Sequence, residues 1–210
     1  MSDLLPLFPL PNVVLFPNVF LPLHVFEPRY REMVADALGG DRLIGMVLLK
    51  PGWEHDYNGR PAVYPIGCHG LVTHAERLDD GRYNIVLRGV ERFRIVEEVQ
   101  DHSYRRASVE PVVEERGSAD DRVAVRHQRA KLESLLAPTI ERAGADLAIP
   151  SAMADEELVH ALAQYLDLEP IEKQALLEQT SLRARAESLV ELLEMKMMTS
   201  RTLSAPHVFH

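Results

Sequence analysis

Three side chains that could ligate a metal or act as nucleophiles lie close together in the middle of the chain: Cys68, His69 and His74. A structural zinc site takes four ligands, and no second cysteine or carboxylate stands at ligand spacing from these residues. Their segment has a strand-like sequence, in which neighbouring side chains point to opposite faces. His69 and His74 are therefore expected on opposite faces, and Cys68 should point away from His69. We predict neither a metal site nor a Cys–His nucleophilic pair here.

A pair of carboxylates, Asp79-Asp80, could serve as general acid and base, but Gly81 follows directly, and this pattern is typical of a hairpin turn. The sequence lacks the Gly-x-x-x-x-Gly-Lys-Ser/Thr loop that cradles nucleotide phosphates. It also lacks the Gly-x-Ser-x-Gly elbow of a serine nucleophile. We therefore expect no catalytic residue, no metal site and no cofactor, and we predict that the protein is not an enzyme.

Between Leu43 and about Val113 the sequence alternates short apolar runs with turn residues, which is typical of β-strands. Gly67 and Gly70 interrupt one of these runs and indicate a bulge or a bend. Residues 53–61 are expected to form an exposed loop. Many short strands with glycine bends predict a small, strongly curved sheet or barrel. The expected strands cover residues 43–49, 66–78, 83–87, a segment around 92–95, and 104–112.

Six prolines punctuate the apolar N-terminal segment, at positions 6, 9, 11, 17, 22 and 28. Proline fixes φ and lacks an N–H donor, so we expect short extended pieces and no continuous helix or central strand across these positions. From Pro28 the spacing changes, and apolar residues at 30, 33, 34, 37 and 38 predict a helix over residues 28–38. Gly39-Gly40 is expected to end this helix.

Beyond Glu114 the pattern is almost entirely helical, with one apolar stripe in each segment. Such stripes bury against one another, so these segments are expected to form a bundle. The expected helices cover residues 119–136, residues 151–166, a short segment that starts at Pro170, and a segment that starts near Ser181. We thus predict a β domain over residues 1–115, a helical bundle over 116–200, and a loosely ordered tail over 201–210.

The composition sets limits on compartment and partners. A chain of 210 residues can bury a sizeable core without disulfides, and its single cysteine suits a reducing compartment. No basic region precedes the apolar N-terminal segment and prolines break it, so we expect no signal peptide, no membrane partner and a cytoplasmic location. The formal net charge of −9 argues against a mainly electrostatic partner such as nucleic acid.

Several irregular motifs share the N-terminal segment: Phe8-Pro9-Leu10, Leu15-Phe16-Pro17, Leu21-Pro22-Leu23 and Phe26-Glu27-Pro28-Arg29-Tyr30. In this series the chain resembles the N-terminal substrate-recognition domain of Lon proteases. Residues 81–95 and 169–193 are similar to later blocks of the same family, so the resemblance covers about residues 4 to 197. The family usually has glycine where Asn18 stands, and asparagine is the next most tolerant residue of positive φ.

The resemblance implies an α+β protein, in which a PUA-like, curved β-barrel is followed by a C-terminal helical bundle. Lon proteases carry ATPase and protease modules after this domain, and the chain matches neither a phosphate loop nor the Ser–Lys dyad of the Lon protease. We therefore expect a stand-alone, non-catalytic member of the family that captures unfolded or apolar polypeptide segments. A separate ATPase or protease is a further candidate partner.

Aromatic side chains on a curved sheet can take up an extended apolar segment. The candidate peptide-binding residues are Trp53 and Tyr57 on the expected loop, and Phe16 and Phe20 in the proline-rich segment. Each of the four has core packing as its alternative role, because aromatic residues are more often buried than free to bind.

Two alternative functions remain open. PUA-like domains often bind RNA, yet residues 77–106, the most basic segment, carry a net charge of only +1 from seven arginines and six acidic residues. Residues 151–200 carry a net charge of −6 and could form an acidic docking scaffold for a partner ATPase or protease. Binding to a charged partner should weaken steeply with salt, whereas capture of an apolar segment should not.

Overall fold

A computed structural model describes residues 4–56, 59–115, 117–143, 150 and 152–203. The chain forms two compact units. The first, here called the barrel unit, contains Met1–Val113 and His160–Glu178, and the second, the helical unit, contains Glu114–Val159 and Gln179–His210. The barrel unit thus takes in a helical segment far along the sequence. The predicted division into residues 1–115 and 116–200 stays a prediction, and most of the expected tail lies outside the described residues.

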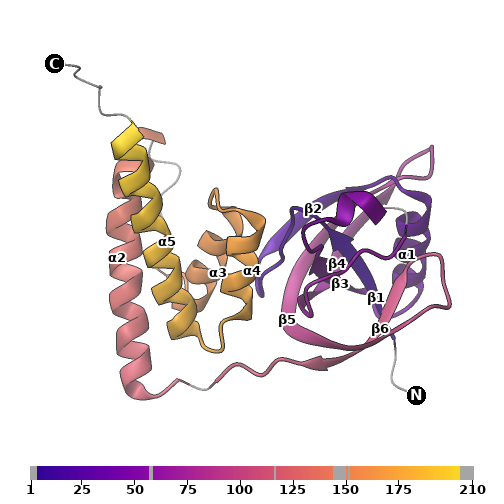
Figure 1. Cartoon of the computed structure of the whole chain (residues 1–210), viewed down its shortest axis with the longest axis horizontal. Helices are drawn as coiled ribbons and strands as arrows, with labels where there is room; N and C mark the ends of the chain where they lie inside the picture. Colours follow the sequence, from indigo (N-terminus) through magenta and orange to yellow (C-terminus); the bar gives the residue numbers. More distant parts are fainter. Residues whose placement is uncertain (1–3, 57–58, 116, 144–149, 151, 204–210) are drawn as a thin grey trace. The chain divides into compact units, whose positions relative to one another are not determined.

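A mixed six-stranded sheet forms the barrel unit (Figure 1). Its order is β2-β5-β4-β3-β1-β6, and a further pairing of β5 with β6 closes five of the strands into a ring, with β2 added beside β5. The pairing of β1 with β3 is parallel and the other pairings are antiparallel. The predicted α+β fold with a curved barrel is confirmed. The strands are β1 (Leu5–Leu10), β2 (Phe20–Val25), β3 (Leu43–Leu48), β4 (Ile66–Arg77), β5 (Tyr83–Val99) and β6 (Arg105–Pro111).

Strand β1 corrects one expectation, because it is a central strand that contains two prolines. Pro6 pairs with β6 and Pro9 pairs with β3, and only Leu7 has a partner in both strands. Each proline therefore lies where the register places a partner on one side only. Its missing N–H does not interrupt hydrogen bonding to strands on both sides. A short staggered strand can accommodate prolines that a long central strand would exclude.

Strand β5 joins two segments that the sequence indicated as separate strands. It runs unbroken for 17 residues, and its ladder with β4 shifts register between Cys68 and Gly70. A bulge of this kind bends the strand, so the first half of β5 pairs with β2 and the second half with β6. The bend predicted from Gly67 and Gly70 is confirmed. Gly67 is also sterically required, since a Cβ there would overlap the carbonyl oxygen of Met46 and the ring of Phe93.

Two apolar clusters lie on opposite faces of β3. The barrel cluster includes Val47 and centres on Phe93, which is fully buried. The other, the α1 cluster, includes Ile44 and Met46 and is covered by helix α1 (Pro28–Gly39). Since side chains alternate along a strand, a short, wholly apolar strand can fill both clusters at once.

Within the barrel unit, polar contacts with backbone groups join residues 160–178 to residues 1–113. Residues 160–178 form most of helix α3 (Asp155–Tyr165) and helix α4 (Pro170–Glu178). Gln164 Oε1 accepts a hydrogen bond from the buried N–H of Phe16 (3.2 Å), and Gln174 Nε2 donates to the carbonyl of Ile66 (2.9 Å). In the reverse direction, the buried Arg92 donates to the Leu177 carbonyl near the end of α4 (2.8 Å), where a cation is favoured.

Helices α2 (Ala119–Ala143) and α5 (Leu182–Leu203) pack side by side in the helical unit (Figure 1). Their seam buries apolar side chains such as Leu132 and Leu189. Ion pairs join Asp121 to Arg183 (3.1 Å) and Lys131 to Glu194 (2.8 Å). The sequence predicted that α2 would end at residue 136, before Pro138; it continues to Ala143, because proline disfavours a helix interior without excluding it.

Candidate polypeptide-binding surfaces

The short helix η1 (Trp53–Asp56) carries Trp53 beside a shallow groove of about 250 Å³. Gly52, directly before it, has φ +90°, a backbone conformation that glycine adopts without strain. The groove walls include Pro11, Pro51, Trp53, Tyr64 and Ile171, and Glu54 is the one charged side chain among the described residues that line it. We call this depression the Trp53 groove.

Backbone hydrogen bonds fix the walls of the Trp53 groove. Lys50 N–H donates to the Ala62 carbonyl (2.8 Å), which joins the two ends of the loop, and Tyr64 N–H donates to the Leu48 carbonyl at the end of β3 (2.9 Å). Ile171, in the first turn of α4, remains 49% exposed. A groove lined by an exposed aliphatic residue and a partly buried tryptophan can take up an apolar side chain from another molecule.

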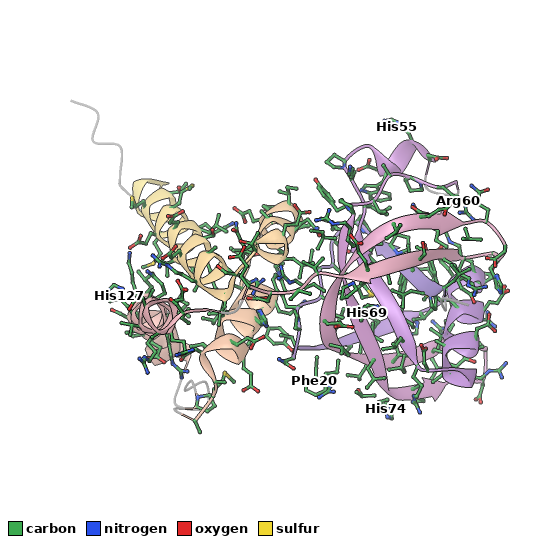
Figure 2. All side chains as sticks on the ribbon, turned by 90° about the horizontal axis from the view of Figure 1, so that it is seen from below. Phe20, His55, Arg60, His69, His74 and His127 are labelled. Atoms are coloured by element: carbon green, nitrogen blue, oxygen red, sulfur yellow. The ribbon has the colours of Figure 1, made fainter. Side chains whose placement is uncertain are left out.

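The second exposed apolar surface is on β2. Phe20, Pro22 and His24 point outward, and the residues between them point toward the α1 cluster. Phe20 is 50% exposed, and Figure 2 shows it at the margin of the barrel unit, directed away from the strands. The hydroxyl of Tyr165, itself 65% exposed, donates to the Phe20 carbonyl (2.8 Å).

The four predicted peptide-binding residues have different outcomes. Phe16 is fully buried, with its ring centroid 6.0 Å from that of His160, so it packs in the core and is unavailable to a ligand. Tyr57 lies outside the described residues. Trp53 and Phe20 are both accessible but not together, since Figure 2 shows helix η1, at His55, and Phe20 at opposite ends of the barrel unit.

Sequence reasoning missed Tyr64, Ile171 and Tyr165. Tyr165 is brought to Phe20 by a contact between residues 145 positions apart. Ile171 lies in the Trp53 groove because α4 packs on the strands of the barrel unit. The one local signal was Ile171 itself, an apolar residue directly after Pro170 in the first turn of a predicted helix. For such a residue, burial within the helix bundle was the simpler expectation.

Most arginines of the basic segment are engaged by other protein groups. Arg82 pairs with Asp80 (2.6 Å), Arg106 with Asp101 (3.0 Å), and Arg105 bonds both carboxylate oxygens of Glu98. The hydrogen bond from the Arg82 backbone N–H is the main cause that holds the pKa of Asp80 below its usual value. These contacts leave few cations to form a phosphate-binding stripe.

The prediction that His69 and His74 lie on opposite faces of β4 is wrong, because the register shifts between Val72 and His74 and reverses the alternation. Cys68, Val72 and Ala75 all pack in the α1 cluster, so both histidines lie on the other face. His69 packs against Phe93, with ring centroids 4.8 Å apart, and burial lowers its pKa although Glu91 opposes the shift. His74 is exposed farther along the same face. Within the described ranges, no three His, Cys, Asp or Glu side chains gather in a way that could hold a metal ion.

Solved structures share this fold. The Lon N-terminal domain protein from Xanthomonas campestris matches with a TM-score of 0.60 and 25% identity, over 90% of this chain and 98% of that one. The N-terminal domain of the Mycobacterium avium complex Lon protease matches with a TM-score of 0.71 and 16% identity, over 91% and 98% of the two chains. The fold is therefore that of Lon N-terminal domains.

Residues 4–195 match the family described as the ATP-dependent protease La (LON) substrate-binding domain, and the chain belongs to this family. It is 32% identical to Lon protease 2 of Myxococcus xanthus over 200 residues, which are 92% of this chain and 24% of that protein. A Lon protease of Anaeromyxobacter dehalogenans is also 32% identical, over 91% of this chain and 23% of that protein. The chain thus spans about a quarter of these relatives, and the matched part is the substrate-binding domain, not the ATPase or protease module.

Among the described residues, no helix combines the length and the apolar character needed to cross a bilayer.

Proposed function

We propose that this domain captures unfolded or apolar polypeptide segments without catalysing a reaction, and that the Trp53 groove holds their apolar side chains. The observation that carries the proposal is the groove itself, with exposed apolar walls and a single charged residue among the described lining. Membership of a substrate-binding family supports protein substrates as the ligands. The captured segments would be clients of an ATPase–protease such as the relatives of this chain.

The size of the groove determines how tightly one contact can bind. A volume of about 250 Å³ accommodates roughly one large side chain. Burying about 150 Å² of apolar surface contributes roughly 3 to 4 kcal/mol, which corresponds to a dissociation constant near 1 mM. Micromolar capture therefore requires further contacts along the same segment, and one groove alone would release a client readily.

The test is the binding of a fluorescent, permanently unfolded polypeptide, followed by anisotropy at low and high salt, with single-stranded RNA as competitor. We expect micromolar binding that persists in high salt and resists RNA. Trp53→Ala and Ile171→Ala should each weaken binding about three- to tenfold, because each removes part of one apolar contact. Val96→Ala, at an exposed apolar position outside the groove, is the matched control and should leave binding unchanged.

Two results would overturn the proposal. Binding of RNA alone, lost in high salt, would identify a nucleic-acid module. Failure to bind the unfolded polypeptide, with intact folding shown by circular dichroism, would exclude capture and direct attention to protein partners of the acidic helices.

A further inference from the structure

We propose that the outer face of β2, β5 and β4 is a second polypeptide contact, selective for segments in which an acidic residue adjoins apolar ones. The proposal rests on the polypeptide binding proposed above, but it concerns another surface and another chemical preference. We call this surface the Phe20 face. Its residues are Phe20, Pro22, Leu71, His74, Val86 and Arg88.

The strand register arranges these side chains in rows. Phe20 is directly opposite Arg88 on β5, and Arg88 is directly opposite Leu71 on β4. Directly paired residues share a face and have Cβ atoms about 5 Å apart. The Arg88 side chain therefore emerges between an exposed aromatic and an aliphatic residue. Figure 2 shows Phe20 and His74, which belongs to the neighbouring row, along the same margin of the barrel unit.

Arg88 has no ionic partner on this face. It is exposed, and no carboxylate among the described residues lies within ion-pair distance of it. Glu76, two rows away, accepts a hydrogen bond from Asn84 (3.0 Å). In a chain with a net charge of −9, one uncompensated arginine between apolar side chains favours a ligand that brings its own carboxylate.

The free edge of β2 determines how such a segment binds. Gly89 N–H donates to the Val19 carbonyl, so alternate residues from Val19 onward bond to β5, and the backbone groups of residues 20, 22 and 24 point to the free edge. At that edge the Phe20 carbonyl already accepts from Tyr165, and Pro22 has no N–H. Addition of another strand would therefore lack consecutive hydrogen bonds, and the segment must bind across the face by its side chains.

The first experiment compares two fluorescein-labelled peptides, Gly-Ser-Leu-Phe-Asp-Leu-Ser-Gly and its counterpart with Asn for Asp, on the full chain by anisotropy. We expect the Asp peptide to bind about three- to fivefold more tightly at low salt, the size of one exposed ion pair. Arg88→Gln should abolish this ratio, and Arg77→Gln, an exposed arginine at the far end of β4, should preserve it. Equal binding of the two peptides to the natural chain would overturn the proposal.

A double comparison separates this surface from the Trp53 groove. In the Trp53→Ala variant the Asp/Asn ratio should persist, even though both peptides bind more weakly. In the Phe20→Ala variant both peptides should weaken and the ratio should shrink, because the apolar contact beside Arg88 is lost. Loss of the ratio in Trp53→Ala alone would assign the selectivity to the groove and overturn the proposal while leaving polypeptide capture intact.

A third probe tests the mode of binding. The Asp peptide with N-methyl groups at its two leucines cannot donate hydrogen bonds from those positions. We expect its affinity to change less than twofold, because the segment contacts the face through side chains. A tenfold loss would show addition of a strand at the β2 edge and would overturn binding across the face.

Discussion

The barrel unit and the helical unit are stabilised by different kinds of contact. In the barrel unit, five strands close into a ring, and side chains of residues 160–178 bond mainly to backbone groups of the barrel. In the helical unit, α2 and α5 share one apolar seam, with ion pairs between charged side chains around it. A ladder of backbone bonds is insensitive to most substitutions, whereas a helix pair depends on particular side chains. Substitutions in the two units should therefore have separable effects.

The single tryptophan makes this comparison measurable. Trp53 lies in the barrel unit, so its fluorescence reports unfolding there. Far-ultraviolet circular dichroism is dominated by helices, of which α2 and α5 are the longest. Urea unfolding followed by both signals tests whether the units unfold separately or as one cooperative body.

The largest expected effect is that of Phe93→Ala, because Phe93 is fully buried at the centre of the barrel cluster. Removing its ring should leave a cavity and lower the free energy of unfolding by about 4 kcal/mol. The fluorescence transition should move to lower urea, and Val96→Ala at an exposed position is the control. An equal shift of the dichroism transition would show that the two units unfold together.

The counterpart in the helical unit is Arg185→Ala. Arg185 is fully buried, and its guanidinium bonds both carboxylate oxygens of Glu114 (3.0 and 3.2 Å) and the Gln179 carbonyl. The substitution removes both of these bonds to the partly buried Glu114 carboxylate, which should lower the free energy of unfolding by about 3 kcal/mol, seen mainly in the dichroism transition. Arg183→Ala, which removes exposed ion pairs that water and salt screen, should have a much smaller effect. An equal loss of unfolding free energy in the two variants would contradict the expectation that buried ionic contacts matter more than exposed ones.

Gln164→Ala tests whether residues 160–178 stabilise the barrel unit. The substitution removes the acceptor of the buried Phe16 N–H, and an unpaired buried donor costs about 2 kcal/mol. We expect this loss in the fluorescence transition, although Gln164 lies in a helix. Gln128→Ala, at a partly buried position of α2, should leave that transition in place. A shift confined to dichroism would place α3 energetically with the helical unit.

The contrast between the units also explains what the sequence could predict. Each helix has its own stripe of apolar residues, so all of the helices α1 to α5 were expected near their true positions, and α1 and α4 begin where Pro28 and Pro170 indicated. Strand pairing is non-local, so the merging of residues 83–99 into one strand and the central position of β1 were not visible in local patterns. The prolines of β1 argued against a central strand because the stagger of its partners cannot be read from one segment.

The candidate site shows the same limit at single residues. In β2 the residues of both faces are largely apolar, so alternation could not show that Phe20 faces solvent. Local sequence could not show whether Phe16 is exposed; in the structure it is fully buried, with the ring of His160 nearby. Asn18 was a clearer case: it was expected to tolerate positive φ where the family has glycine, and its φ is 63°. The backbone conformation at residue 18 could thus be predicted from residue type. The exposure of Phe16 and Phe20 could not, because it depends on how α3 packs.

The smallest expected effect is a pH dependence that belongs to the barrel unit alone. Burial lowers the pKa of His69 in the folded chain below its usual value of 6.5, and the carboxylates of Glu91 and Asp41 partly oppose the shift. Between the two pKa values the unfolded chain binds more protons, so stability is complete above pH 6.5 and falls as the pH drops through the folded value. Urea midpoints followed by Trp53 fluorescence should decrease from pH 7.5 to 5.5.

His69→Gln should flatten this pH dependence, while His74→Gln, at an exposed position of β4, should not. Glu91→Gln removes a carboxylate that raises the pKa of His69, so the folded pKa should fall further and the loss of stability should extend to lower pH. Hydrogen bonds lower the pKa values of carboxylates such as Asp80 and Asp101, so these groups add a further loss of stability in more acidic solution. This loss is common to all variants and cancels when they are compared. An unchanged slope in His69→Gln would show that the imidazole is as accessible to protons in the folded chain as in the unfolded one.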